Sequence, residues 1–159
     1  MARVIDTKQL LIEAGFDAKI CSGGSTGTYN IDGKLPGVTE LQPGSYVFMD
    51  VEYQKIGGQN NSEMYDDFLP SLTVLTSVVS ATYSDRVTVD AGIKALDTTT
   101  PFAPVPLIEK HLAYTRGGDE FGFLTSESGP LPKLGERMEL IVPHCDPTVG
   151  LHDRMYVVK

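Results

Sequence analysis

From residue 44 to the C-terminus the chain is built of short β-branched and aromatic runs separated by turn residues, and this pattern constrains the fold more than any other feature. Runs of this length with Gly, Pro, Asn and Asp between them are typical of β-strands joined by tight connections. The predicted strands are residues 45–53, 72–83, 86–92, 107–115, 120–126, 137–144 and 154–159. The sequence therefore predicts a mainly β fold in which residues 44–159 form an antiparallel β-barrel or sandwich domain.

Residues 1–43 follow a different pattern. A helix is predicted over residues 7–16, with Thr7 as its N-cap and Gly15 as its stop. A short apolar run and a loop with three glycines at residues 23–27 follow. Helix, strand and glycine loop are the parts of an α/β unit, so a small N-terminal α/β segment is expected before the β domain.

The length of 159 residues limits the class of enzyme that the chain can form alone. It suits one domain with a substantial core, whereas a complete (β/α)8 barrel needs at least about 200 residues.

The 21 acidic and 13 basic residues give a net charge of −8. This charge repels phosphate backbones and anionic lipids, so no nucleic-acid partner and no membrane role are expected. The sequence shows no membrane-spanning run and no signal peptide, and its two cysteines are too few for a disulfide framework, so a cytoplasmic protein is predicted.

The motif VPHCDPT at residues 142–148 follows an apolar run and carries the strongest chemical signal. In an extended chain alternate side chains share a face, so His144 and Asp146 are expected to point to one side and Cys145 to the other. An imidazole and a carboxylate at this spacing can hold a divalent ion such as Zn or Mn. The alternative is a strand-end histidine that is hydrogen bonded to Asp146 without a metal. His152 and Asp153 are further candidate ligands or solvated turn residues.

The loop SGGSTGT combines glycines with hydroxyl side chains. Backbone N–H groups and the hydroxyls of Ser22, Ser25, Thr26 and Thr28 can converge on an anion here and form a phosphate cradle. The spacing does not match a Walker A loop. It does match GxSxG, in which Ser25 would be the nucleophile of a small serine hydrolase. A plain glycine turn is the third interpretation.

Lys94 and an acidic pair are two weaker candidates. Lys94 alternates with Asp90 and Gly92 in an apolar run, where a buried lysine could form a Schiff base with a carbonyl or with pyridoxal phosphate. The simpler interpretation is a surface lysine paired with Asp90. Asp119 and Glu120 follow two glycines, which is typical of an acidic hairpin tip.

Five segments, taken in order, resemble the C-terminal part of D-threonine aldolases and their D-serine dehydratase relatives. The segments are GGSTGT (23–28), TELQPGSYVFMD (39–50), VDAGIKALDT (89–98), GGDEFGFL (117–124) and GERMELIVPHCDPTVGLHD (135–153). The resemblance extends from about residue 15 to the end. That family belongs to the alanine-racemase-like pyridoxal phosphate enzymes. In these enzymes a (β/α)8 barrel precedes a C-terminal β domain, and the proteins usually act as dimers. The resemblance implies that residues 1–43 are the remnant of the end of such a barrel and that the chain forms a homo-oligomer.

The resemblance also implies roles for two sets of residues. His144 and Asp146 match the family's metal-ligand pair in its aldolase form. The loop that faces the cofactor phosphate is matched by Gly23, Gly24, Ser25 and Thr26. The implied substrate is a small D-3-hydroxy amino acid. Its implied reaction is a metal-assisted retro-aldol cleavage to glycine and an aldehyde, with pyridoxal phosphate as the electron sink and Mn or Zn as the metal.

The sequence departs from the family at three places. The family's Schiff-base lysine lies near the start of the barrel and has no counterpart here, and Lys94 lies in a different motif. Gly150 stands where the family pattern has Asn, and Phe121 where many relatives carry His. The prediction is the metal-binding C-terminal domain of a D-threonine aldolase-like lyase that is inactive alone. The alternatives are a stand-alone binding or self-assembly module with an uncovered apolar face, and a serine hydrolase that uses Ser25.

Overall fold

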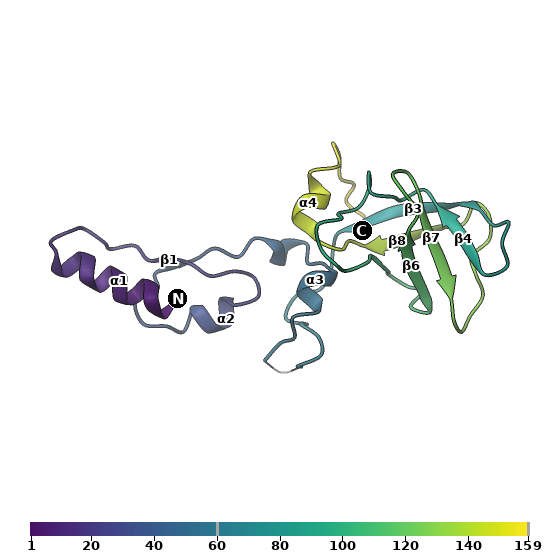
Figure 1. The fold of residues 1–159 in the computed structure, drawn as a ribbon. Coiled ribbons are helices and arrows are strands. Elements are labelled where there is room, and N and C mark those ends of the chain that lie inside the picture. The colour runs from purple at the N-terminus through teal and green to yellow at the C-terminus, as the bar shows by residue number, and fades with distance from the viewer. Residues whose placement is uncertain (60, 159) are drawn as a thin grey trace. The chain divides into compact units, whose positions relative to one another are not determined.

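The computed structural model describes residues 1–59 and 61–158 (Figure 1). The chain divides into two compact units, Met1–Val47 and Phe48–Lys159. Most of the regular structure consists of strands, and the first unit adds a small α/β segment, so the predicted fold class is confirmed. None of the helices in the described ranges combines the length and the hydropathy that a membrane span requires.

Helix α1 (Ala2–Glu13) opens the first unit and begins earlier than predicted. Thr7 is not its N-cap, because the Thr7 hydroxyl lies inside the helix and donates to the carbonyl oxygen of Arg3 (2.9 Å). Gly15 adopts a φ of +87°, a left-handed conformation that favours glycine. The predicted stop signal therefore acts as expected just after the last helical turn.

Short elements complete the first unit. Strands β1 (Ser22–Gly23) and β2 (Glu40–Leu41) pair in parallel. Helix α2 (Tyr29–Asp32) lies between them in sequence, and the 3-10 helix η1 (Ser45–Val47) follows. The glycine-rich loop thus connects β1 to α2.

Six strands of the second unit form one antiparallel sheet in the order β5-β8-β3-β4-β7-β6. They are β3 (Thr73–Ser80), β4 (Arg86–Val89), β5 (Val105–Pro106), β6 (Leu112–Arg116), β7 (Gly122–Ser126) and β8 (Arg137–Ile141). Helices α3 (Val51–Gln54) and α4 (Cys145–Val149) precede and follow the strands in sequence. The two edge strands, β5 and β6, contact each other, so the sheet curves into a nearly closed barrel (Figure 1).

Two of the predicted strands are wrong. Residues 45–53 form η1 and α3, because Met49 adopts a φ of +52° and the Asp50 side chain caps α3, and both features interrupt an extended run. Residues 154–158 are exposed and pair with no described strand, and residue 159 lies outside the described residues. Alternating apolar residues alone do not make a strand without a neighbour to pair with.

Strand β5 is not predicted by the sequence pattern. It contains two residues, Val105 and Pro106, which are too few to show an alternation. Pro106 is compatible with the ladder because β5 lies at an edge of the sheet, where proline is tolerated. The other five predicted strands correspond to β3, β4, β6, β7 and β8, each of which has fewer residues than predicted.

The apolar interior of the second unit consists of alternate side chains of the strands. These side chains, each at most 2% exposed, include Val87, Val89, Leu124 and Leu140. Val142, which follows β8 directly, and Cys145, the first residue of α4, belong to the same cluster and are fully buried. The core therefore extends to the base of the segment that carries His144.

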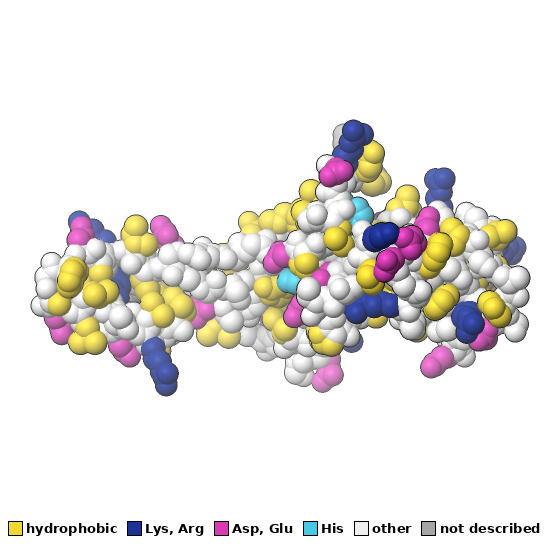
Figure 2. Space-filling view, turned by 45° about the horizontal axis from the view of Figure 1, so that its top comes forward, with side chains coloured by type: hydrophobic (Ala, Val, Ile, Leu, Met, Phe, Trp, Pro, Cys, Tyr) yellow, Lys and Arg dark blue, Asp and Glu magenta, His cyan; other side chains and the backbone are white. Residues whose placement is uncertain are grey.

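Charged side chains of both signs share the surface. On the face seen in Figure 2, Lys and Arg side chains are interspersed with Asp and Glu rather than gathered into one patch. Two exposed pairs, Lys94 with Glu120 and Arg86 with Asp85, are ion pairs. This face therefore presents no electrostatic field of a single sign.

Candidate metal centre

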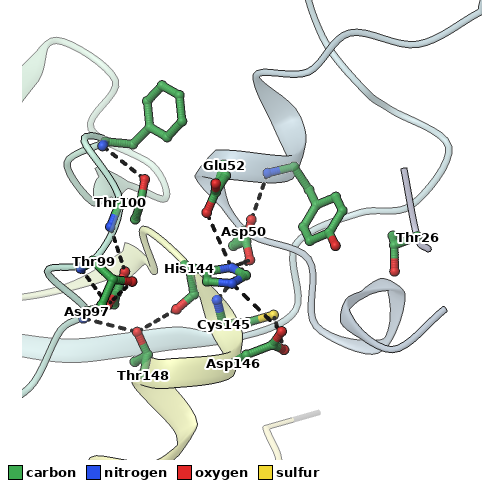
Figure 3. Close-up of polar contacts among 12 residues, drawn as sticks. Thr26, Asp50, Glu52, Asp97, Thr99, Thr100, His144, Cys145, Asp146 and Thr148 are labelled. Carbon is green, nitrogen blue, oxygen red and sulfur yellow. Dashed lines mark hydrogen bonds and ion pairs between the residues drawn. The ribbon is translucent and has the colours of Figure 1, made fainter. Parts of the chain in front are cut away.

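The candidate site lies where strand β8 ends and the chain turns into helix α4. His144 is extended, with φ −141° and ψ 129°, and is the N-cap of α4. Asp146 lies in the first helical turn, so the expectation that residues 144–146 form one extended segment is wrong. The turn nevertheless brings the side chains near each other, with His144 Nε2 3.7 Å from Asp146 Oδ2 (Figure 3).

Asp50 faces the other nitrogen of the His144 ring (Figure 3). The Asp50 side chain is fully buried, and its Oδ2 lies 2.9 Å from His144 Nδ1. The same oxygen accepts the backbone N–H of Cys145 (2.8 Å), and Oδ1 accepts the backbone N–H of Tyr53 (2.8 Å). Aspartate is a preferred N-cap residue, which is the one local signal in the sequence for Asp50. Its proximity to His144, 94 positions away, arises only from the fold.

The backbone around Asp50 is anchored to the segment after β8. The N–H of Val51 donates to the carbonyl oxygen of Val142, and the N–H of Glu52 donates to that of Pro143, both at 3.1 Å. Met49, fully buried, holds a positive φ that is uncommon for residues other than glycine. Packing and hydrogen bonds thus hold a strained backbone beside the carboxylate.

Two sets of possible ligand atoms meet at His144. One set consists of Asp50, His144 and Cys145, whose candidate ligand atoms all lie within 4.8 Å of one another. On the Nε2 side lies Asp146, whose Oδ1 accepts a hydrogen bond from the Cys145 thiol (3.4 Å). His152 joins neither set, because its Nε2 lies 2.9 Å from a backbone carbonyl oxygen.

Carboxylates surround the His144 imidazole. Besides Asp50, Glu52 Oε2 lies 3.6 Å from Nδ1. Partial burial lowers the pKa of His144, but the hydrogen bond to Asp50 and the charges of Asp50, Glu52 and Asp146 outweigh it. The net effect raises the pKa above its ordinary value of about 6.5. These negative charges favour a positive charge at the ring, whether a proton or a bound cation.

We expect the stability of the metal-free chain to depend on pH through His144. Because the folded-state pKa is raised, protonation of the ring stabilises the fold fully below the unfolded-state pKa of about 6.5. This contribution is lost as pH rises through the folded-state pKa. Urea unfolding of the wild-type and His144→Ala chains with a chelator, between about pH 5 and pH 9, measures it. The stability advantage of wild type should shrink as pH rises, and an advantage that grows would contradict the expectation.

A buried polar network holds the backbone of His144 from the other side. The Thr148 hydroxyl donates to the carbonyl oxygen of His144 (2.7 Å) and accepts the backbone N–H of Asp97 (3.2 Å). Asp97 accepts hydrogen bonds from the N–H and the hydroxyl of Thr99, both at 2.8 Å. Burial raises the pKa of Asp97, but these hydrogen bonds outweigh it and lower the pKa. Helix α4 is therefore fixed at both ends of its first turn.

The glycine-rich loop lies in the first unit. Gly23 ends β1, and Gly24 adopts a φ of +81°. The N–H of Ser25 donates to a hydroxyl three residues further on (3.1 Å). Thr26 is buried, and its hydroxyl oxygen accepts the backbone N–H of Tyr46 (3.0 Å). The N–H of Ser25 and the hydroxyl of Thr26 thus hold the turn in place within the first unit.

The contacts of Ser25 and Lys94 bear on the other two chemical alternatives. All three histidines lie in the second unit, whereas Ser25 lies in the first. Lys94 is exposed and pairs with Glu120, not with Asp90 as expected. Asp90 instead accepts a hydrogen bond from the Thr76 hydroxyl (2.7 Å). The hydrogen bond to Glu120 raises the pKa of Lys94, which keeps the amine protonated and unreactive toward carbonyls.

The fold matches that of solved lyase structures. D-threonine aldolase from Filomicrobium marinum superposes on 94% of this chain with a TM-score of 0.84 and 34% identity. D-threo-3-hydroxyaspartate dehydratase from Delftia sp. HT23 matches 95% of the chain with a TM-score of 0.75 and 24% identity, which supports the fold alone. This chain covers 39% and 44% of those two chains. Its barrel-like sheet and small α/β segment are therefore those of the D-threonine aldolase fold.

Sequence relatives agree with the structural match. D-threonine aldolase of Arthrobacter sp. is 40% identical over 153 residues, and 3-hydroxy-D-aspartate aldolase of Paracoccus denitrificans (strain Pd 1222) is 33% identical over 156 residues. Residues 71–158 match the family described as "Putative serine dehydratase domain". The chain therefore belongs to this family, as the sequence motifs predict. It spans 39% of the length of both relatives and corresponds to their C-terminal portion.

Proposed function

We propose that this chain is the metal-binding C-terminal domain of a D-threonine aldolase-like lyase, in which His144 Nε2 and the Asp146 carboxylate hold a divalent cation. The observation that supports this most strongly is the contact of Nδ1 with Asp50, because it leaves Nε2 beside Asp146 Oδ2 at 3.7 Å. An imidazole nitrogen and a carboxylate oxygen are donors that suit Zn²⁺ and Mn²⁺. The surrounding carboxylates add favourable charge, so the residues present fit a cation.

The proposed role of the site is to position a cation for a small D-3-hydroxy amino acid. A cation bound there supplies Lewis-acid chemistry that lowers the pKa of a substrate hydroxyl. The chain's own residues hold the imidazole rigidly on its Nδ1 side and leave the Asp146 side of the site open to solvent. The buried Asp50 and Thr148 fix the imidazole and its backbone, whereas the Asp146 side chain is 66% exposed. Two protein ligands also leave coordination positions open for substrate or water.

We further propose that residues 23–26 hold the phosphate of pyridoxal phosphate, which supplies an electron sink for carbanion chemistry when bound. Glycines with neighbouring hydroxyl residues are the residue types that phosphate-binding turns use, and this supports the proposal. The family's Schiff-base lysine has no counterpart among the matched motifs, and Lys94 is paired with Glu120. We therefore infer that the chain alone does not catalyse the retro-aldol cleavage.

Isothermal titration calorimetry with Mn²⁺ and Zn²⁺ tests the metal site. The wild-type chain should bind one ion of either kind. Loss of a residue that only supports a ligand typically weakens metal binding about 10–100-fold, and His144→Ala should weaken it by more than that because it removes a ligand. His111→Ala is the matched control, since its half-buried ring contacts the carbonyl oxygen of Pro130 (3.1 Å) away from the site. Binding of equal strength by the wild-type and His144→Ala chains would refute the proposed site.

A further inference from the structure

We propose that Asp50 is the positioning residue of the metal site: it fixes His144 in the tautomer with the proton on Nδ1 and is not itself a ligand. The proposal rests on the proposed function in one respect, which is that His144 Nε2 is the atom that binds the cation. The tautomer that it assigns is, however, a property of the metal-free chain. The two can therefore be tested separately.

The hydrogen bonds and the burial of Asp50 disfavour a role in coordination. Its Oδ2 lies 2.9 Å from His144 Nδ1, which is a hydrogen-bond distance. The remaining lone pairs of the carboxylate are largely used, because Oδ2 also accepts the N–H of Cys145 and Oδ1 accepts that of Tyr53. The side chain is 0% exposed, so no direction is open for a further ligand.

The same contact determines the position of the ring proton. A carboxylate oxygen accepts hydrogen bonds, so His144 Nδ1 must be the donor. A neutral imidazole with its proton on Nδ1 has its lone pair on Nε2, which is the nitrogen beside Asp146. Donation of the second ring N–H to a carboxylate also orients a histidine ligand and increases its basicity. The structure thus prepares Nε2 for a cation before one binds.

The Asp50 carboxylate is itself held in place by interactions that do not involve a metal. Asp50 caps α3 through the N–H of Tyr53, and the next residue, Val51, donates its N–H to the carbonyl oxygen of Val142. The preceding residue, Met49, is fully buried with a positive φ. Such a conformation persists only where the surroundings determine it strongly. The position of Asp50 relative to His144 is therefore set by the fold.

Nuclear magnetic resonance of the metal-free, ¹⁵N-labelled full chain tests the tautomer directly. Long-range ¹H–¹⁵N spectra, recorded above the pKa of His144, distinguish a protonated from an unprotonated ring nitrogen. We expect Nδ1 of His144 to be protonated and Nε2 to be unprotonated. The reverse assignment in the wild-type chain would overturn the proposal, and this measurement needs no variant that must fold.

The Asp50→Asn chain then tests the effect on the metal. Asparagine keeps the shape and one accepting oxygen, but it cannot satisfy every N–H that the carboxylate accepts. We expect a shift of the His144 ring toward the Nε2–H tautomer and an about 10–100-fold loss of Mn²⁺ affinity in calorimetry. Asp90→Asn is the matched control, because this carboxylate accepts the N–H of Ser77 (2.7 Å) in the same unit without facing the imidazole. It should leave both tautomer and affinity unchanged.

The outcomes separate this proposal from the proposed function. Wild-type Mn²⁺ affinity in Asp50→Asn, together with lost binding in His144→Ala, would refute the positioning role alone. Equal losses in Asp50→Asn and Asp90→Asn would show a general destabilisation and would also refute it. Undiminished binding in His144→Ala would instead refute the proposed metal site, and with it the effect of Asp50 on the metal.

Discussion

Replacement of Leu140 with alanine should lower the free energy of unfolding by about 2–5 kcal/mol, the range for a leucine removed from a well-packed core. Leu140 lies in the middle of β8 and is fully buried. It is opposite Val74 of β3 on one side and Pro106 of β5 on the other. Because strands flank Leu140 on both sides, the backbone cannot collapse into the space. The loss therefore includes the cavity as well as the lost transfer free energy.

Urea unfolding followed by circular dichroism measures this loss, and the neighbouring strand offers a matched control. Leu75 of β3 is 64% exposed and lies opposite Glu139. Leu75→Ala should change the free energy of unfolding by no more than about 0.5 kcal/mol. The urea dependence of unfolding should be unchanged in both variants if the surface exposed on unfolding is the same. Similar losses in the two variants would contradict the inward placement of Leu140.

The alternation along β8 explains why most of the β domain could be predicted from the sequence. In the run RMELI the side chains of Met138 and Leu140 are buried, and those of Arg137 and Glu139 are exposed. A period of two residues can be recognised in the sequence alone, because it depends only on which face of one strand packs against the core. Where a strand carries this pattern and finds neighbours, as β8 does between β5 and β3, the prediction holds.

The same reasoning fails where contacts that are distant in sequence decide the local conformation. The run of residues 45–53 has the apolar and aromatic content of a strand, yet it forms η1 and α3. Its conformation depends on hydrogen bonds to the segment after β8, including that of Val51 with Val142, and on the buried, left-handed Met49. No pattern within nine residues contains that information. Residues 154–158 show the converse, because their apolar residues meet no described strand.

The residues of the candidate site also differ in whether the sequence alone could identify them. His144 and Asp146 could be singled out because they are two positions apart and both are potential metal ligands. Asp50 could not, since its link to His144 joins segments 94 positions apart. The partner of Lys94 was predicted wrongly for a similar reason. Asp90 lies close in sequence, but Lys94 in fact meets Glu120 across the fold, 26 positions away.

Gly92→Ala should also destabilise the second unit, by repulsion rather than by a cavity. A Cβ at this position would lie 2.4 Å from the carbonyl oxygen of Asp119, 2.5 Å from the backbone nitrogen of Phe121 and 2.6 Å from the carbonyl oxygen of Gly118. All three are backbone atoms of the β6–β7 connection, so no flexible side chain can turn aside. Overpacking of this kind costs about 1–3 kcal/mol, and occasionally more.

We expect the loss at Gly92 to fall at the upper end of that range, because relief of the clash also breaks hydrogen bonds. The N–H of Ile93 donates to the carbonyl oxygen of Gly118 (3.2 Å), and the N–H of Lys94 donates to that of Asp119 (3.0 Å). The connection cannot move away from a new methyl group without stretching both bonds, and each contributes about 0.5–1.5 kcal/mol. Gly92 is thus required by the close approach of two backbone segments.

The control for Gly92 is the same substitution at a glycine that has room for a side chain. Gly150 has a φ of −64°, and a Cβ there would lie 3.4 Å from its nearest neighbour, the carbonyl oxygen of Pro147. Gly150→Ala should therefore be neutral or should stabilise the chain by up to about 1 kcal/mol, because alanine restricts the unfolded chain. Thermal or urea unfolding of both variants measures the contrast. Wild-type stability in Gly92→Ala would show that the β6–β7 connection does not approach residue 92 as closely as the structure places it.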